Sequence, residues 1–338
     1  MGTKIEWTEA TWNPVTGCTP VSAGCANCYA RRMATRFAGR NGYPADEPFR
    51  VTLHPGKLAD PLRWKKPRRV FVCSMGDLFH ERVAAHTIAQ VWAAMAVCPE
   101  HIFQVLTKRP QQMHDWLTDN NVRGMAAMEA ANMVEDGDIQ FDAVSHAFDK
   151  TGCLSNVWLG VSIEDQATAD ERIPLLLQCP AAVRFASYEP ALGPVDLYGE
   201  KRDYLSNLGR RNGPVIQRGL DWVIAGGESG PGARPAHPDW FRSVRDQCAE
   251  AGVPFFFKQW GEWLTWEEVG EKNVGGGIVS MFRDAASGCD NDDVPIFHGL
   301  REHEWDEYGG ATAYRVGKKR SGRRLDGREH NGMPEGTP

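Results

Sequence analysis

Seven short apolar runs recur along the chain, and most of them lack the alternating polar residues of a half-exposed strand. They occupy Ala10–Trp12, Val70–Met75, Ile102–Thr107, Val157–Ile163, Val183–Tyr188, Trp222–Gly227 and Pro254–Lys258. Nearly continuous apolar runs of this length are typical of parallel strands that are covered on both faces. The pattern therefore predicts a parallel β-sheet.

Apolar residues at helical spacing lie between several of these runs. One such stretch extends from Val83 to Met95, and another from Trp240 to Ala251. Pro238 stands near the start of the second stretch and Gly252 just past its end, as helix termini favour. Alternating strands and helices indicate βαβ units. We therefore predict an α/β fold, a partial (β/α)6-type barrel of parallel strands with helical and loop insertions.

The 338 residues fit a single barrel with insertions. We expect the barrel to occupy residues 1–270, with insertions at about 113–156 and 198–219. Residues 271–338 would form a C-terminal extension with a basic tail, packed on the barrel rather than independent.

The composition indicates an ordinary globular protein. Lys and Arg number 38 against 44 Asp and Glu, so the net charge is −6. The first residues lack the apolar core of a secretory signal, and no apolar stretch is long enough to span a membrane. We therefore expect a cytoplasmic protein without a membrane partner, whose nine cysteines are not paired in disulfides.

Each predicted strand is followed by polar or charged side chains. In chain order they are Cys18 and its loop, Ser74 and Asp77, Thr107 to Arg109, Ser162 and Glu164, Ser187 and Glu189, Glu228 and Ser229, and Lys258 and Gln259. The carboxyl ends of parallel strands meet on one face, and that face carries the site in α/β folds. The alternative is that polar residues simply begin where strands end.

Three cysteines fall within eleven residues, in the segment Cys18-Thr-Pro-Val-Ser-Ala-Gly-Cys25-Ala-Asn-Cys28. A loop of this kind can wrap one metal centre. A [4Fe–4S] cluster normally takes four thiolates, so three would leave one iron open for a substrate or cofactor. The alternatives are a zinc knuckle, with Cys73, His54 or His80 as fourth ligand, and thiols that bind no metal.

The cysteine loop resembles that of the radical S-adenosylmethionine (SAM) superfamily, although the spacing here is Cx6CxxC rather than CxxxCxxC. The whole chain also resembles an uncharacterised phage and prophage family, the Gp-thirty-seven/Gp-sixty-eight family. The matching motifs are IEWTEATWNPVTGC, GCANCYA, FVCSMGDLF, LTKRP, NVWLGVSIE, RFASYEP, WVIAGGESG, FFFKQWGEW and the tail GKK…GRRLDGREHN.

The superfamily resemblance implies that Cys18, Cys25 and Cys28 ligate three irons and that SAM binds the fourth. Ser74-Met75-Gly76-Asp77 would meet the SAM amino group. Ser162 and Glu164 would contact the ribose, and Arg109 or Lys108 would pair with the SAM carboxylate. Other readings stay open: a strand-end turn for the tetrapeptide, a helix cap for Glu164, and a solvated helix start for Lys108 and Arg109.

Two glycines and three charged residues complete the expected site. Gly226 and Gly227 would let the backbone approach a flat ligand closely. Glu189, Glu228 and Lys258 would point into the barrel mouth and orient a polar substrate as catalytic residues. The structural alternative for these three is that they serve only the fold.

Aromatic and basic residues leave two further questions open. Trp7, Trp12, Trp260, Trp263 and Trp266 flank the expected mouth in sequence; they would either stack on bases or fill the core. The tail Arg315–Arg328 holds seven basic residues and one acid, and it would either contact phosphates or face solvent.

The sequence thus predicts a radical SAM enzyme that cleaves SAM to a 5′-deoxyadenosyl radical. Its substrate would be a nucleotide or nucleic acid, and its electron donor a flavodoxin- or ferredoxin-like protein. The alternative is a non-catalytic zinc or iron–sulfur module of phage origin that binds nucleic acid. A metal-dependent hydrolase is disfavoured because no His-rich strand ends are present.

Overall fold

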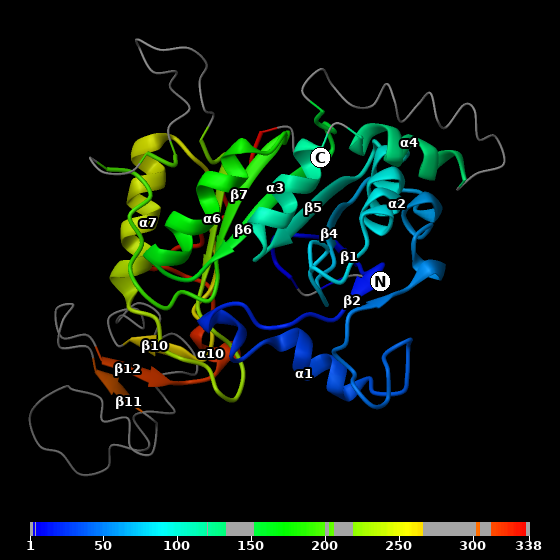
Figure 1. Ribbon diagram of the computed structural model, residues 1–338. Helices are drawn as coiled ribbons and strands as arrows, with labels where there is room; N and C mark the ends of the chain where they lie inside the picture. Colours follow the sequence, from blue (N-terminus) through cyan, green and yellow to red (C-terminus); the bar gives the residue numbers. More distant parts are fainter. Residues whose placement is uncertain are drawn as a thin grey trace, which may run out of the picture.

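The computed structural model describes residues 3, 5–119, 121–132, 152–199, 203–205, 219–265, 302–304 and 312–335. Its centre is a seven-stranded sheet in the order β1-β4-β5-β6-β7-β8-β9, in which every neighbouring pair is parallel. These strands are β1 (Ala10–Trp12), β4 (Arg69–Val72), β5 (Ile102–Thr107), β6 (Val157–Ile163), β7 (Val183–Tyr188), β8 (Trp222–Gly226) and β9 (Phe255–Gln259). The sheet curls into a half-barrel with helices between its strands (Figure 1).

The α/β fold predicted from the apolar runs is confirmed. All seven runs form strands of the one sheet, and the short run Ala10–Trp12 pairs with β4. The boundaries of β8 and β9 differ from the predicted runs by one residue, and the largest difference is at the end of β4, which stops at Val72 rather than Met75. Cys73 has a φ of 56°, in the left-handed region, which interrupts the extended chain there.

Helices cover the outer face of the sheet. They are α2 (Ala85–Ala96), α3 (Pro110–Thr118), α4 (Val122–Ala131), α6 (Gln166–Gln178) and α7 (Pro238–Ala251), and short 3-10 turns lie at Ala23–Cys25, Pro55–Lys57 and Pro61–Arg63. Both predicted helical stretches are confirmed as α2 and α7. Pro238 is the first residue of α7, and Gly252 ends it with a φ of 69°. Much of both predicted insertions, and Cys289 and Trp266, lie outside the described residues.

Smaller elements lie beside the carboxyl edge of the sheet. β2 (Val15–Thr16) pairs with β3 (Thr52–Leu53), and α1 (Tyr29–Arg36) follows the cysteine loop. A second sheet has the order β10-β12-β11, from Trp263–Thr265, Thr312–Arg315 and Glu302–Glu304. The short helix α10 (Lys318–Ser321) follows β12, and the chain then returns to β9, where Gly332 N donates to Phe255 O at 2.9 Å.

Alternation along the strands separates two apolar cores. Val223 and Ala225 of β8 belong to the large outer core beneath the helices. Trp222 and Ile224 belong to an inner core that fills the concave side of the sheet. The inner core consists of Trp7, Phe71, Trp158, Val183, Phe185, Trp222, Ile224 and Phe256.

The tryptophans flanking the mouth in sequence are core residues wherever they are described. Trp7, Trp12 and Trp260 are each 2% exposed and Trp263 is 8% exposed. They are therefore not available to stack on bases. In the described part of the chain, every helix is too short or too polar to cross a membrane.

Candidate functional site

The three clustered cysteines lie on a loop that crosses the carboxyl edge of the sheet. Cys18 follows β2, Cys25 ends a 3-10 turn, and Cys28 immediately precedes α1. All three are free thiols of intermediate exposure, whereas every other described cysteine is buried. Exposure thus separates the cysteine loop (residues 18–28) from the structural thiols of the core.

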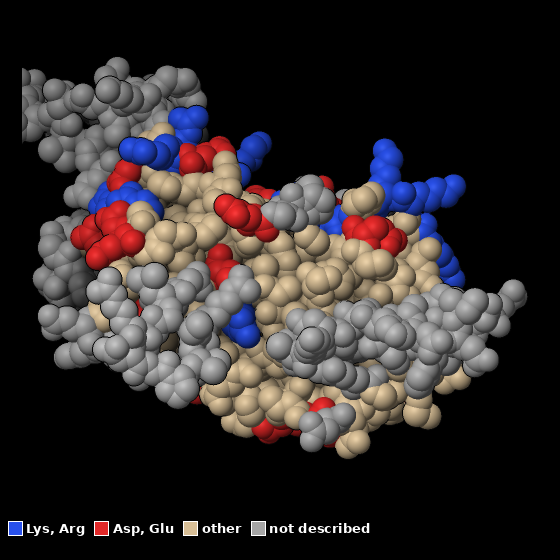
Figure 2. Space-filling view, turned by 90° about the horizontal axis from the view of Figure 1, so that it is seen from above, with Lys and Arg blue, Asp and Glu red and all other residues tan. Residues whose placement is uncertain are grey.

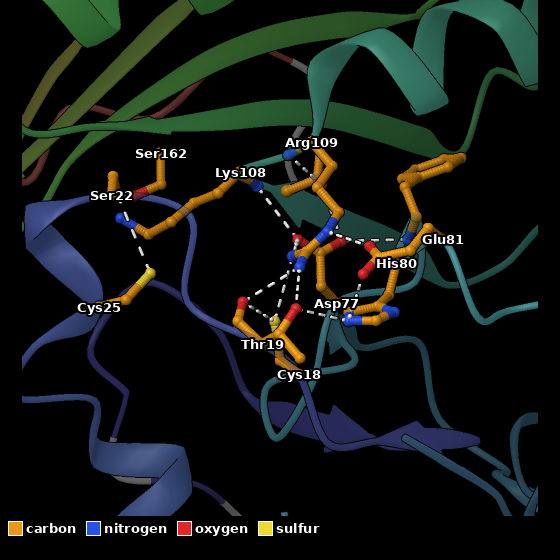
Figure 3. A network of polar contacts seen from close by, with 12 residues as sticks. Cys18, Thr19, Ser22, Cys25, Asp77, His80, Glu81, Lys108, Arg109 and Ser162 are labelled. Carbon is orange, nitrogen blue, oxygen red and sulfur yellow. Dashed lines mark hydrogen bonds and ion pairs between the residues drawn. The ribbon is translucent and has the colours of Figure 1, made fainter. Parts of the chain in front are cut away.

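Arg109, at the end of β5, holds the first part of the cysteine loop (Figure 3). Its guanidinium donates to Cys18 Sγ at 3.1 Å and to the Thr19 carbonyl and hydroxyl at 3.0 and 2.9 Å. It also pairs with Asp77 at 3.3 Å and with Glu81 at 3.1 Å. The side chain is 4% exposed, so it is an internal brace for the loop and not a solvated cation at a helix start.

Glu164, at the end of β6, holds the middle of the loop. Its Oε1 accepts from Ser22 Oγ at 2.8 Å and from Arg172 at 3.2 Å, and it also accepts from Lys108. Gly24 packs closely against this side chain: a Cβ added to Gly24 would come within 2.6 Å of Glu164 Cγ. Glu164 Oε2 is buried and has no hydrogen-bond partner among the described residues.

Glu228, just after β8, holds the last part of the loop. Asn27 Nδ2, between Cys25 and Cys28, donates to Glu228 Oε2 at 3.0 Å. Arg234 forms a two-pronged pair with the same carboxylate at 2.8 and 2.7 Å and also donates to Ala23 O at 3.0 Å. Three different strand ends therefore fix one eleven-residue loop.

The tetrapeptide Ser74–Asp77 forms a turn beneath Cys18, and it is largely engaged within the protein. Met75 O accepts from Gly17 N at 2.9 Å, and the Ser74 carbonyl accepts from the Tyr29 hydroxyl. Asp77 accepts from Thr107 at 2.7 Å and from the backbone N–H of Phe79 and Lys108 at 3.0 and 3.2 Å. The turn thus binds the cysteine loop to β4.

The inner face of the sheet changes character toward its carboxyl edge. Along β6, Trp158 is followed on the same face by Gly160 and Ser162; along β7, Phe185 is followed by Ser187. Ser162 Oγ donates to Glu189 O at 3.0 Å, and the Glu189 carboxylate pairs with Lys258 of β9 at 3.0 Å. The concave side is therefore aromatic near the strand starts, and small or polar near their ends.

Both strand-end glycines are in close contact with protein atoms, Gly227 with fixed backbone and Gly226 with the end of a flexible side chain. A Cβ on Gly226 would lie 2.6 Å from Glu189 Oε1, and one on Gly227 would lie 2.7 Å from the carbonyl carbon of Trp260. Packing therefore requires a glycine at position 227, whereas at position 226 the Glu189 side chain would have to move.

The pKa values of Cys18 and Cys25 are shifted in opposite directions. Burial, with the nearby Asp77 carboxylate, raises the pKa of Cys18 to about 11 despite Arg109. Burial also raises that of Cys25, but hydrogen bonds at the Val21 and Ser22 backbone, the charge of Lys108 and the Ser22 side chain outweigh it, and its pKa is lowered. Burial raises the pKa of Cys248 to about 12, as expected for an inert core thiol.

A single metal ion does not fit the thiols as they stand. Within the described residues, no three His, Cys, Asp or Glu side chains are grouped closely enough to hold one. Cys25 lies apart from Cys18, beside Ser22 (Figure 3). His54 and His80, the expected fourth zinc ligands, instead bond Thr16 and Thr19 at 2.8 and 2.9 Å, and Cys73 is buried. A cluster takes each thiolate on a different iron, so its ligands need not converge on one point.

The structure brings most of the predicted residues to one edge, but in two groups. The loop-bracing group contains Asp77, Arg109, Glu164 and Glu228, and the inner group contains Ser162, Glu189 and Lys258. Sequence reasoning missed Ser22, Asn27, Arg172 and Arg234. Asn27 had the clearest signal, because it lies between two predicted ligands.

Glu228 gives a pH-dependent prediction. Burial raises its pKa, but hydrogen bonds from Arg234 and Asn27 outweigh this, so its folded pKa lies below the usual 4.5. Its contribution to stability is therefore complete above pH 4.5 and is lost as pH falls through the folded pKa. We expect Glu228→Gln to lower the free energy of unfolding by about 2 kcal/mol at pH 7. Urea titrations should show that difference shrinking below pH 4; a gap unchanged down to pH 3 would contradict the assignment.

A family model described as "Protein of unknown function (DUF5131)" matches residues 2–334. The match carries no phage description, so the predicted phage resemblance gains no support from it. No curated protein is similar enough to the chain to count as a relative.

Among solved structures, the chain is similar to spore photoproduct lyase. A complex with dinucleoside spore photoproduct is 10% identical with a TM-score of 0.36, over 90% of this chain and 68% of the other. A variant of that lyase is 10% identical with a TM-score of 0.38, over 95% and 71%. A further variant, with bound AdoMet and dinucleoside spore photoproduct, is 12% identical with a TM-score of 0.36, over 90% and 68%.

Proposed function

The chain belongs to the DUF5131 family, whose description assigns no activity, and we propose that it is a radical SAM enzyme. The observation that carries the proposal is the bracing of the cysteine loop by three strand ends. Arg109, Glu164 and Glu228 each reach a different part of this loop. A loop fixed so thoroughly, yet carrying three half-exposed free thiols, is suited to hold a cofactor in a set position.

Cys18, Cys25 and Cys28 would hold a [4Fe–4S] cluster whose fourth iron is open to SAM. When bound, these groups would supply one-electron reductive cleavage of SAM to a 5′-deoxyadenosyl radical, chemistry that belongs to the cofactors. The donor set supports a cluster over zinc, because the loop offers three thiols, whereas the expected fourth zinc ligands His54 and His80 are bonded to threonines and Cys73 is buried.

The residues of the chain would bind and orient the ligands. Glu164 Oε2 is the strongest candidate acceptor for a ribose hydroxyl, since it is buried and unpaired within the described chain. Gln259 Oε1, at the end of β9, is a second buried acceptor of the same kind. Arg109 would set the position of the Cys18 thiolate through its hydrogen bond.

The inner group of polar residues would face the substrate. Ser162, Glu189 and Lys258 lie where the inner face becomes small and polar, above a base of packed aromatic rings. This closed base would exclude water from below. A nucleotide or nucleic acid is the proposed substrate class, and a flavodoxin- or ferredoxin-like protein the proposed electron donor.

Electron paramagnetic resonance of the reduced, reconstituted chain tests the proposal. The chain would be purified without oxygen and loaded with iron and sulfide. We expect a cluster signal that changes when SAM is added, because SAM would bind an iron directly. Stoichiometric zinc with no cluster absorbance would support the zinc module instead.

A further inference from the structure

Two segments of the chain are strongly basic and contain no acid. Residues 29–45 hold four arginines, and residues 315–325 hold six lysines and arginines. The whole chain has a net charge of −6, so the rest of it is correspondingly acidic. Charge of one sign is therefore concentrated in two short stretches that are far apart in sequence.

The fold brings these two segments together at Gly230, just after β8. Arg315, which precedes α10, donates to Gly230 O at 2.8 Å. Arg32 of α1 donates to Ser229 O at 3.2 Å, and a Cβ on Gly230 would collide with its guanidinium. Figure 1 likewise shows α10 and α1 next to each other below the strand ends.

Six of the remaining basic side chains of these segments are exposed, and we call them the basic surface: Arg31, Arg36, Arg40, Lys318, Lys319 and Arg320. Arg323 is not part of it, because it is partly buried and pairs with Glu329 at 3.4 Å. In the part of the chain that the structure describes, no carboxylate forms an ion pair with any of these six. The face seen from above in Figure 2 differs, because Asp and Glu side chains lie there among the Lys and Arg side chains.

The basic surface borders the cysteine loop. Asn27 donates to Gly232 O at 2.6 Å, and Arg234 donates to Ala23 O, so the Gly230 segment lies against the loop. A polyanion held along α1 and α10 would therefore pass the carboxyl edge of the sheet.

We propose that the basic surface binds the phosphate backbone of a nucleic acid strand and directs that strand to the mouth of the half-barrel. A single strand presents one charge about every 3.4 Å, which suits cations spread over two adjacent elements. Such contacts position a nucleic acid without reading its sequence. The proposal rests on the proposed function only in taking nucleic acid as the substrate.

The exposed side chains favour a nucleic acid over an acidic protein partner. A protein interface has an apolar centre with a polar rim. The large apolar side chains exposed in the described chain are Val21, Tyr29, Leu53 and Met128. Tyr29 is the one that belongs to α1, and none of the four lies on α10, where exposed Lys318, Lys319 and Arg320 are consecutive.

Fluorescence anisotropy with the full chain, without metal, tests the surface directly. The probes are labelled 30-nucleotide single-stranded DNA, the same sequence as RNA, and a duplex, each over a series of salt concentrations. We expect Lys318→Gln with Lys319→Gln to weaken binding of at least one probe roughly tenfold or more at 0.1 M salt. For a single-stranded probe, the slope of the logarithm of the association constant against the logarithm of the salt concentration should become less steep by about 1.4, which is about 0.7 for each lysine removed. Arg36→Gln with Arg40→Gln should do the same.

The matched control is Lys65→Gln with Lys66→Gln. These lysines are equally exposed, but they precede β4 and so lie toward the opposite edge of the sheet. Equal weakening by the control, no binding of any probe at 0.1 M salt, or equal affinity for a polyglutamate peptide would each overturn the proposal. The assay needs no cluster, so its failure can be told apart from failure of the proposed function. A chain that assembles its cluster but binds no oligonucleotide would refute the proposed role of the basic surface and leave the proposed radical SAM function standing.

Discussion

Replacing Cys25 with alanine should remove nearly all bound iron from the reconstituted chain. Cys25 is the second of the three predicted ligands, and its burial is outweighed by hydrogen bonds at the Val21 and Ser22 backbone and by the charge of Lys108, which lower its pKa. Its loss leaves two of the three thiolates of the loop, and every other described cysteine is buried. Iron should fall from about four per chain to near background, as measured by metal analysis and visible absorbance.

Cys248→Ala is the matched control for this change. Cys248 is fully buried in the outer core on α7, far in sequence from the loop, and its substitution removes one sulfur of the same kind. The control should keep its full iron content and lose at most modest stability. Equal iron loss in both variants, or full iron in Cys25→Ala, would show that the wrong cysteines were chosen.

Gly227→Ala should lower the free energy of unfolding by about 3 kcal/mol or more, with or without a cofactor. The added Cβ would lie 2.7 Å from the carbonyl carbon of Trp260 and closer still to its oxygen. The backbone cannot easily move away, because Gly227 N donates to Gln259 O at 2.9 Å. Overpacking against fixed backbone atoms is among the costlier single substitutions. Urea unfolding of the metal-free chain measures the effect.

Gly56→Ala is the control for Gly227, since a Cβ on Gly56 would meet no heavy atom within 4 Å. We expect that variant to stay within about 0.5 kcal/mol of the parent. If Gly227→Ala were as stable as the parent but bound SAM less well, the glycine would serve the approach of a ligand. That was the expectation from the sequence, and the packing against Trp260 argues for the other role.

The sheet could be predicted from the sequence because its strands are nearly continuous apolar runs. The runs Ile102–Thr107, Val157–Ile163 and Val183–Tyr188 match the observed strands to the residue. The end of β4 could not be predicted in this way, because Cys73 and Met75 are as apolar as the strand residues before them and the left-handed backbone of Cys73 leaves no trace in hydropathy. The spacing of apolar residues indicates which side chains are buried, but it carries no information about a single backbone torsion angle.

The sequence could predict where the site residues lie but not which hydrogen-bond partners they have. Strand-end position pointed to Asp77, Arg109, Glu164 and Glu228, because parallel strands share one carboxyl edge. Their partners depend on which part of the cysteine loop crosses which strand. That path pairs Ser22 with Glu164 and Asn27 with Glu228, across 142 and 201 residues of sequence. Partners so far apart in the chain leave no local pattern in a single sequence from which they could be predicted.

The central claim is that the cysteine loop holds a cluster with one iron open to SAM. The most direct measurement is the paramagnetic resonance spectrum of the reduced chain, recorded with and without SAM, beside Cys25→Ala prepared identically. We predict a cluster signal in the parent that shifts on adding SAM, and no such signal in the variant. A parent spectrum that is identical with and without SAM would contradict the claim.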